Sequence, residues 1–197
     1  MTGCTNVQLG NLVRYKDLLT DWSTRFNLVG PGALDIFWSR HAFDSWQLLT
    51  AAPVSRRWAD LGSGAGFPGV VLAIGLASEA DAVVHLVESQ AKRCRFLTHV
   101  VETLQLPAMV DNARAESFSR PVDVVTARAC APMTRLLAFA YPWMAQGAIG
   151  LFLKGETIEA ELVEARQAWS FEVDLRPSTS DPRGRIVRIE RLAHRVG

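Results

Sequence analysis

The chain has 197 residues, of which 49% are hydrophobic, and a formal net charge of +1 at pH 7. The longest apolar runs are far shorter than the ~20 residues of a membrane-spanning helix, and the N-terminus lacks the basic-then-apolar order of a signal peptide. The near-neutral charge argues against a protein that coats nucleic acid, because such proteins are strongly basic. We therefore expect one cytoplasmic, monomeric domain over residues 1–197 with no membrane partner.

Two helices are predicted at the N-terminus. From Val7 to Phe26, apolar residues recur mostly at helical spacing with polar residues between them, which is typical of an amphipathic helix. A second helix is expected over residues 34–49, after the "GPG" breaker at 30–32. We expect residues 1–50 to form a helical cap on a core that spans residues 56–197.

From residue 57 onward, short apolar runs alternate with longer amphipathic ones, as in "VVHLVE" followed by "KRCRFLTHVVETLQL". This alternation predicts βαβ units around a mainly parallel sheet, and hence an α/β fold of the Rossmann-like class. Near the C-terminus, "FEVDLRP" and "RIVRIERL" are separated by "STSDPRG", which leaves no room for a helix. These two segments should form an antiparallel hairpin at one edge of the sheet.

The segment "DLGSGAGFPG" at 60–69 predicts a glycine-rich turn between the first strand and the first helix of the sheet. Such a turn lets a ligand approach the main chain where any β-carbon would clash. A dinucleotide fingerprint would need a third glycine at position 67, where Phe67 stands instead. The order Gly62, Gly64, Gly66, with Asp60 before it, resembles the first motif of Rossmann-like methyltransferases that use S-adenosylmethionine as cofactor.

An acidic residue follows at the distance expected for a ribose ligand. The next predicted strand, "VVHLVE", ends at Glu88, whose carboxylate can accept hydrogen bonds from both ribose hydroxyls of a nucleoside. Two other interpretations stay open. The turn could be a purely structural strand-to-helix connection, and Glu88 could be a helix-start carboxylate favoured by the helix dipole.

The cysteines argue against a zinc site and against methylation at pyrimidine C5. Cys4, Cys94 and Cys130 are odd in number and widely spaced, without the histidine pattern of a zinc site, so we expect reduced thiols and no metal. Methylation at pyrimidine C5 would need a thiolate nucleophile. Cys130 is the only candidate, and we interpret it as a small packed hydrophobe.

Over nearly its whole length the chain resembles the small-subunit rRNA methyltransferase G family. The matching pieces are "WSTRFNLVG", "RHAFDS", "DLGSGAGFPGVVLAI", "VESQAKRCRFL", "ARAESF", "TARACAPM" and "FLKGE", in the order of the family. The resemblance implies methyl transfer from S-adenosylmethionine to N7 of one guanosine in 16S rRNA, with this rRNA or the small ribosomal subunit as partner. The departures are "NLVG", where the family usually has Asn-Leu-Thr, and "TARACAP", where Ser-Arg-Ala is more usual.

The resemblance also implies roles for individual residues. Gly62 and Phe67 match turn positions that contact the cofactor, Glu88 matches the ribose ligand, and Ala115 with Glu116 matches the pair beside the adenine. Arg128 matches the arginine at the end of the fourth strand.

Catalysis is expected to rest on positioning. Guanine N7 has an in-plane lone pair and no proton to lose, so its methylation needs no general base. Arg128 and Lys154 are each predicted at the carboxyl end of a strand, where ligands of open α/β sheets bind. We expect Arg128 to orient cofactor or guanosine. Lys154 would contact the RNA backbone or be a solvated lysine.

Further candidates for RNA binding come from the cap and from one helix. His41 and Asp44, at i and i+3, would share a helical face and reach the pocket, or form a surface pair. Lys92, Arg93 and Arg95 form a basic stretch and are candidates for RNA binding. Lys92, Arg95 and His99 would share one helical face and, with Arg56, Arg57 and the C-terminal arginines, form a phosphate-binding surface.

Three other functions compete with this interpretation. They are a nicotinamide-dependent oxidoreductase, a non-catalytic RNA-binding module that has lost methyl transfer, and a methyltransferase acting on another RNA, DNA or a protein. Phe67 argues against the first, and the intact turn with Glu88 and Arg128 argues against the second.

Overall fold

The computed structural model describes residues 1, 3–30 and 32–195. A seven-stranded sheet runs through it in the order β3-β2-β1-β4-β5-β7-β6, with β1 to β5 parallel and β7 antiparallel to both of its neighbours. The strands are β1 (Arg57–Leu61), β2 (Val83–Glu88), β3 (Ala108–Asn112), β4 (Val124–Arg128), β5 (Ile149–Lys154), β6 (Trp169–Pro177) and β7 (Arg185–His194). The predicted α/β fold with an antiparallel C-terminal hairpin is confirmed.

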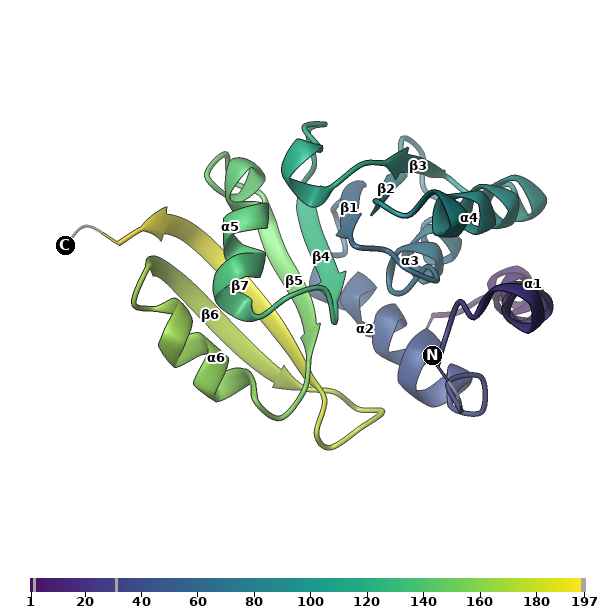
Figure 1. Ribbon diagram of the computed structural model, residues 1–197, viewed down its shortest axis with the longest axis horizontal. Helices are drawn as coiled ribbons and strands as arrows, with labels where there is room; N and C mark the ends of the chain where they lie inside the picture. The colour runs from purple at the N-terminus through teal and green to yellow at the C-terminus, as the bar shows by residue number, and fades with distance from the viewer. Residues whose placement is uncertain (2, 31, 196–197) are drawn as a thin grey trace.

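Helices cover both faces of the sheet (Figure 1). They are α1 (Asn6–Phe26), α2 (Asp44–Ala51), α3 (Gly69–Gly75), α4 (Ala91–Leu104), α5 (Met133–Met144) and α6 (Ile158–Ala165), with a π-helix η1 (Phe37–Phe43) and a short 3-10 helix η2 (Ala115–Ser117). Side chains of α1 to α4 pack in one apolar cluster, and those of α5 and α6 pack in another. Successive side chains of β1 point to opposite faces of the sheet, so Trp58 lies in the first cluster and Leu61 in the second.

The N-terminal cap is built as predicted in its first half only. Helix α1 begins at a capping box, in which the Thr5 side chain accepts from the Gln8 N–H and the Gln8 side chain accepts from the Thr5 N–H. The single helix expected over 34–49 is instead the π-helix η1 followed by α2. None of the helices in the described ranges is both long and apolar enough to cross a bilayer.

The turn of the C-terminal hairpin lies against the cap. The Asp44 carboxylate accepts hydrogen bonds from the hydroxyls of Ser178 and Ser180, and Arg40 forms an ion pair with Asp181. Strand β7 is interior, between β5 and β6, so β6 forms this edge of the sheet and β3 forms the other. The turn between β6 and β7 is therefore bound to η1 and α2.

Removing the Asp44 carboxylate should weaken this contact. Asp44→Ala leaves two buried or half-buried hydroxyls without their acceptor, and we expect the free energy of unfolding to fall by about 2 kcal/mol. Urea denaturation measures the change. Asp17→Ala, which removes an exposed carboxylate from α1, should change the same quantity by less than about 0.5 kcal/mol. Equal losses in the two variants would contradict the prediction.

Candidate functional site

The glycine turn follows β1 and needs its glycines. Gly62, Gly64 and Gly66 all have positive φ, at 70°, 58° and 101°. A β-carbon on Gly62 would lie 2.9 Å from the Cys130 Sγ, and one on Gly66 would lie 2.6 Å from a methyl group of Val70. The backbone conformation and the close packing both exclude side chains here, so the main chain of the turn stays bare.

Asp60 lies beneath the turn and is completely buried. Its Oδ2 accepts a hydrogen bond from the Gly69 N–H at 2.9 Å, while its Oδ1 has no hydrogen-bond partner within the described residues. Burial raises the pKa of this carboxyl to about 7, against the lowering effects of the Gly69 N–H and the Arg128 charge. One oxygen of a titratable group is thus free to accept a hydrogen bond from a bound ligand.

Glu88, the last residue of β2, joins two structural elements at its carboxylate. Its Oε2 accepts from the Gly64 N–H at 2.9 Å, and its Oε1 accepts from the N–H of Gln90, the N-cap of α4, at 2.8 Å. The guanidinium of Arg93 lies 3.7 Å from Oε2. The helix-start interpretation is therefore correct for one oxygen, while the other oxygen binds the glycine turn. Each oxygen keeps a second lone pair for a ligand hydroxyl.

A cavity of about 240 Å³ opens beside this carboxylate. The residues that line it include Gly62, Glu88, Ala115, Glu116 and Cys130. Four of the predicted cofactor residues thus meet at one cavity. Cys130 was interpreted only as a packed residue, and its nearness to Gly62 depends on the chain path after β4, for which the sequence gives no signal.

These residues fit the nucleoside part of S-adenosylmethionine. A buried carboxylate with free lone pairs suits a pair of ribose hydroxyls, and Gly62 in the cavity lining lets a nucleoside approach the main chain. The unpartnered Asp60 Oδ1 suits a cationic group such as the ammonium of the cofactor.

Arg128, at the end of β4, turns toward the cap. Its guanidinium donates to the Arg40 carbonyl oxygen at 3.3 Å and to the His41 Nδ1 at 2.5 Å, and it lies 4.9 Å from the centroid of the Phe67 ring. Burial lowers the pKa of Arg128. Phe67, predicted to contact the cofactor, is itself buried between this guanidinium and the cap.

His41 is held as a neutral ring. Arginine has only donors, so the His41 Nδ1 must accept and the ring proton must lie on Nε2. Burial, and next the charge of Arg128, lowers the pKa of His41 to about 4. The structure shows no direct bond between the His41 and Asp44 side chains. His41 accepts from Arg128, and the Asp44 carboxylate accepts from the hydroxyls of the hairpin turn.

Lys154 lies at the end of β5 as predicted, but its charge is already paired. Its Nζ lies 2.6 Å from the Glu161 Oε2 and donates to the Ala131 carbonyl at 3.0 Å, and the side chain is only 9% exposed. This geometry gives no support to a contact with an RNA backbone.

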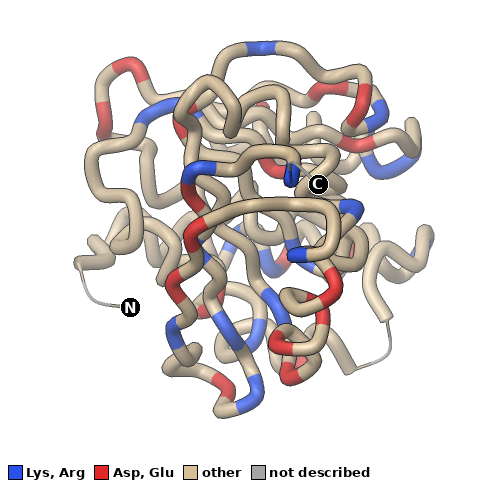
Figure 2. Tube along the Cα trace, turned by 90° about the vertical axis from the view of Figure 1, so that its left-hand side faces the viewer, with Lys and Arg blue, Asp and Glu red and all other residues tan. Residues whose placement is uncertain are grey.

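The basic residues do not form one surface. Lys92 and Arg95 are exposed on α4, and Arg93 of the same helix is the residue that lies beside the Glu88 carboxylate. Arg57 begins β1, so it lies at the amino end of the strand, whereas the glycine turn follows the carboxyl end. Arg57 pairs with Asp123. The C-terminal arginines lie on the hairpin, where Figure 2 shows basic and acidic residues interspersed. Of these predicted residues, Arg93 alone is shown to approach a residue of the cavity, Glu88, while the basic residues that line the cavity itself are Arg114 and Arg135.

Comparison with known proteins identifies the family. Residues 8–181 match the model of the family described as rRNA small subunit methyltransferase G. The chain belongs to this family. It is 57% identical over 193 residues to the ribosomal RNA small subunit methyltransferase G of Caulobacter vibrioides, covering 98% of this chain and 89% of that protein. The enzyme of the same name from Methylorubrum populi is 48% identical over 91% of this chain and 86% of that protein.

The methyltransferase G chain also shares its fold with more distant solved structures. A SAM-dependent methyltransferase from Aquifex aeolicus superposes with a TM-score of 0.59 at 13% identity, covering 88% of this chain and 97% of that one. Magnesium protoporphyrin IX methyltransferase from Synechocystis, solved with bound SAM, superposes with a TM-score of 0.57 at 12% identity, covering 89% and 97%. The expected fold class is confirmed, and S-adenosylmethionine as cofactor agrees with the family and the fold.

The pKa of Asp60 predicts a specific effect of pH on the ligand-free protein. Because the pKa is about 7 in the folded chain and 3.8 as the ordinary value, this carboxyl favours folding fully below pH 4 and loses that contribution as pH rises through 7. Asp60→Asn keeps an acceptor for the Gly69 N–H and removes the charge. We expect the variant to be more stable than wild type at pH 8, by about 4 kcal/mol at most.

The same variant should bind cofactor less well. Unfolding at pH 5 and pH 8 and calorimetric titration with S-adenosylhomocysteine test the two effects separately. A variant that is less stable at pH 8 yet binds cofactor normally would contradict the assignment on both counts.

Proposed function

We propose that this protein transfers the methyl group of S-adenosylmethionine to N7 of a guanosine in the 16S rRNA of the small ribosomal subunit. The observation that carries the proposal is the hydrogen bond between the Gly64 N–H and the Glu88 carboxylate, which sets a bare glycine turn and a ribose-binding acid in one cavity. Membership of the methyltransferase G family supports the rRNA as substrate.

Different residues of the site would bind different parts of the cofactor. Glu88 would accept the ribose hydroxyls, Ala115 and Glu116 would border the base, and Asp60 would face the amino-acid end through its free oxygen. When bound, S-adenosylmethionine supplies a methyl group activated by its sulfonium. The chain must hold this group in line with the acceptor atom, which can contribute on the order of 7 kcal/mol or more.

N7 methylation makes no demand on the two groups that could otherwise act as a base. His41 has its Nδ1 lone pair bound by Arg128 and a pKa of about 4, and the Asp60 carboxyl, with a pKa of about 7, is completely buried. Guanine N7 needs no proton removed, so neither group has to act as a base. Arg128 would act by positioning, because it holds Phe67 beneath the turn.

The RNA would approach from the side of α4. Lys92 lies 4.8 Å from the centroid of the Phe26 ring at the end of α1, and Arg95 is exposed on the same helix. Arg93 connects this region to the Glu88 carboxylate. A small basic surface on α4 suits an enzyme that reads one folded RNA site, since most of the remaining arginines are paired with acids.

The proposal is tested by transfer of labelled methyl from S-adenosylmethionine to small ribosomal subunits, and to naked 16S rRNA, from cells lacking this protein. Nucleoside analysis should recover the label as 7-methylguanosine. The better substrate shows whether the folded subunit or the bare RNA is recognised. Label in another nucleoside would overturn the acceptor atom. Absence of label, despite cofactor binding, would overturn the RNA substrate.

The α4 surface predicts how RNA binding responds to salt. Replacing Lys92 and Arg95 together by Gln should weaken binding and reduce the slope of log K against log salt concentration by about 2, because each side chain neutralises one phosphate. Filter binding over a salt series measures this slope. Arg176 and Arg191 on the hairpin, replaced by Gln together, are the control of equal charge and should leave it unchanged. Equal slopes for the two double variants would exclude α4 as the RNA surface.

A further inference from the structure

Tyr15 reaches from the N-terminal helix into the glycine turn. It lies on α1, is 0% exposed, and donates from its hydroxyl to the Ala65 carbonyl oxygen at 2.6 Å. Ala65 stands between Gly64 and Gly66, so the bond grips the turn at its centre. The hydroxyl is also 2.7 Å from the place where a β-carbon on Gly66 would lie. The Tyr15 hydroxyl thus occupies the space that a side chain at position 66 would need.

The ring of Tyr15 packs against one aromatic ring of the turn and one of the cap. Its centroid lies 5.4 Å from that of Phe67 in the turn and 5.7 Å from that of Phe37, which begins η1. Phe67 in turn packs against His41, with ring centroids 4.8 Å apart. The residues that follow Gly64 are therefore held from below by side chains of the cap, while the carboxylate of Glu88 holds the Gly64 N–H.

The turn needs such a hold because its glycines allow the backbone a wider range of conformations than other residues would. Glycine loses more conformational freedom on ordering than any other residue, and a ligand that orders the turn must supply that free energy. The Ala65–Gly66 peptide has two hydrogen bonds, from the Tyr15 hydroxyl to the carbonyl and from the Gly66 N–H to the Ser63 carbonyl at 2.7 Å. Only the first comes from outside the turn.

We propose that Tyr15 is a positioning residue for the cofactor. Its hydroxyl fixes the Ala65 carbonyl so that the backbone of the turn is ordered before the cofactor binds. The cap thereby contributes to cofactor affinity without touching the cofactor. This inference rests on the proposed function, which assigns the turn to S-adenosylmethionine. Burial raises the pKa of Tyr15 well above its usual range, so the hydroxyl keeps its proton at neutral pH.

Tyr15→Phe separates this role from simple packing, because it keeps the ring and its contacts with Phe37 and Phe67. Removal of the hydroxyl should weaken binding of S-adenosylhomocysteine by about 5- to 10-fold, since the ligand must then order the turn. The KM for S-adenosylmethionine should rise by a similar factor. The kcat at saturating cofactor and the KM for rRNA should stay at wild-type values.

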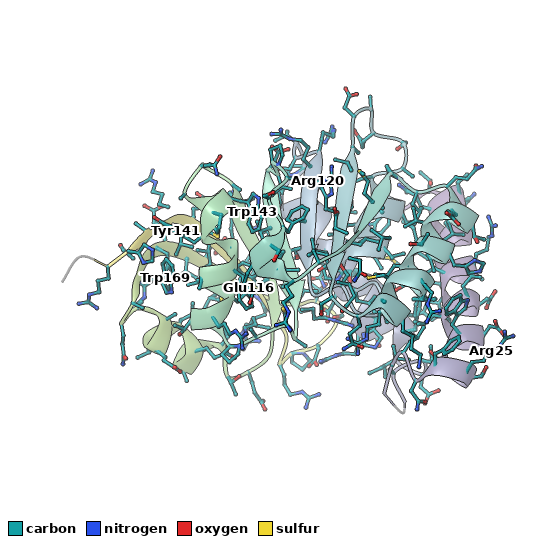
Figure 3. The ribbon with its side chains drawn as sticks, turned by 45° about the horizontal axis from the view of Figure 1, so that its top comes forward. Arg25, Glu116, Arg120, Tyr141, Trp143 and Trp169 are labelled. Atoms are coloured by element: carbon teal, nitrogen blue, oxygen red, sulfur yellow. The ribbon has the colours of Figure 1, made fainter. Side chains whose placement is uncertain are left out.

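The chain offers one matched control, since Tyr141 is its only other tyrosine. Tyr141 packs against Trp169 and His194, and its hydroxyl makes no hydrogen bond with any described residue. Figure 3 shows Tyr141 and Trp169 close together, at the opposite end of the molecule from Arg25 of α1. Tyr141→Phe should leave cofactor affinity unchanged.

Hydrogen exchange on the ligand-free proteins provides a second test that does not depend on activity. In Tyr15→Phe, the amides of residues 63–67 should exchange faster than in wild type, while those of β1 and α4 keep their rates. A role limited to core packing would instead raise exchange throughout α1 and α3.

The outcomes separate the two proposals. If wild type binds S-adenosylhomocysteine and Tyr15→Phe binds it equally well, with unchanged exchange in the turn, the positioning role is overturned and the proposed function stands. If wild type binds no S-adenosylhomocysteine, the proposed function fails, and this inference fails with it. A rise in KM for cofactor alone, together with faster exchange in the turn, supports Tyr15 as the link between cap and cofactor.

Discussion

The site depends on the hydrogen bond that joins the Gly64 N–H to the Glu88 carboxylate. Strands β1 and β2 are parallel neighbours, so the turn after β1 and the acid at the end of β2 emerge at the same edge of the sheet. The bond fixes the turn against the second strand, and Gln90 fixes the same carboxylate to α4. The cavity keeps its shape because its walls share this one buried group.

Charge in the site is controlled mainly by burial. Asp60 is buried without a direct ion pair, and Arg128 is half-buried against a neutral histidine. Both arrangements leave a residual electrostatic cost, which a protein tolerates where a ligand later compensates for it. A cofactor that carries a positive sulfonium and an ammonium is suited to a pocket in which carboxylates face the ligand and the arginine is directed toward the cap.

The sequence predicts those features that depend on local pattern. The glycine order, the acid at the end of the next strand and the short connection of the hairpin all lie within short stretches, and the structure places them as expected. The features that were missed depend on distant partners. Lys154 is neutralised by Glu161 of α6, and Arg128 is bound by His41, which lies 87 positions earlier in the chain. The π-helix η1 was not predicted either, because the spacing of its apolar residues is equally compatible with an ordinary α-helix.

The docking of the hairpin turn on the cap bears on how the protein is made. Asp44 is synthesised 134 residues before Ser178 and 136 residues before Ser180, whose hydroxyls are the main hydrogen-bond partners of its carboxylate. During translation the growing chain therefore carries a cap whose buried carboxylate lacks its hydroxyls. Synthesis of the hairpin turn supplies these hydroxyls, so the contact between the cap and the sheet can form only after β6 has been made.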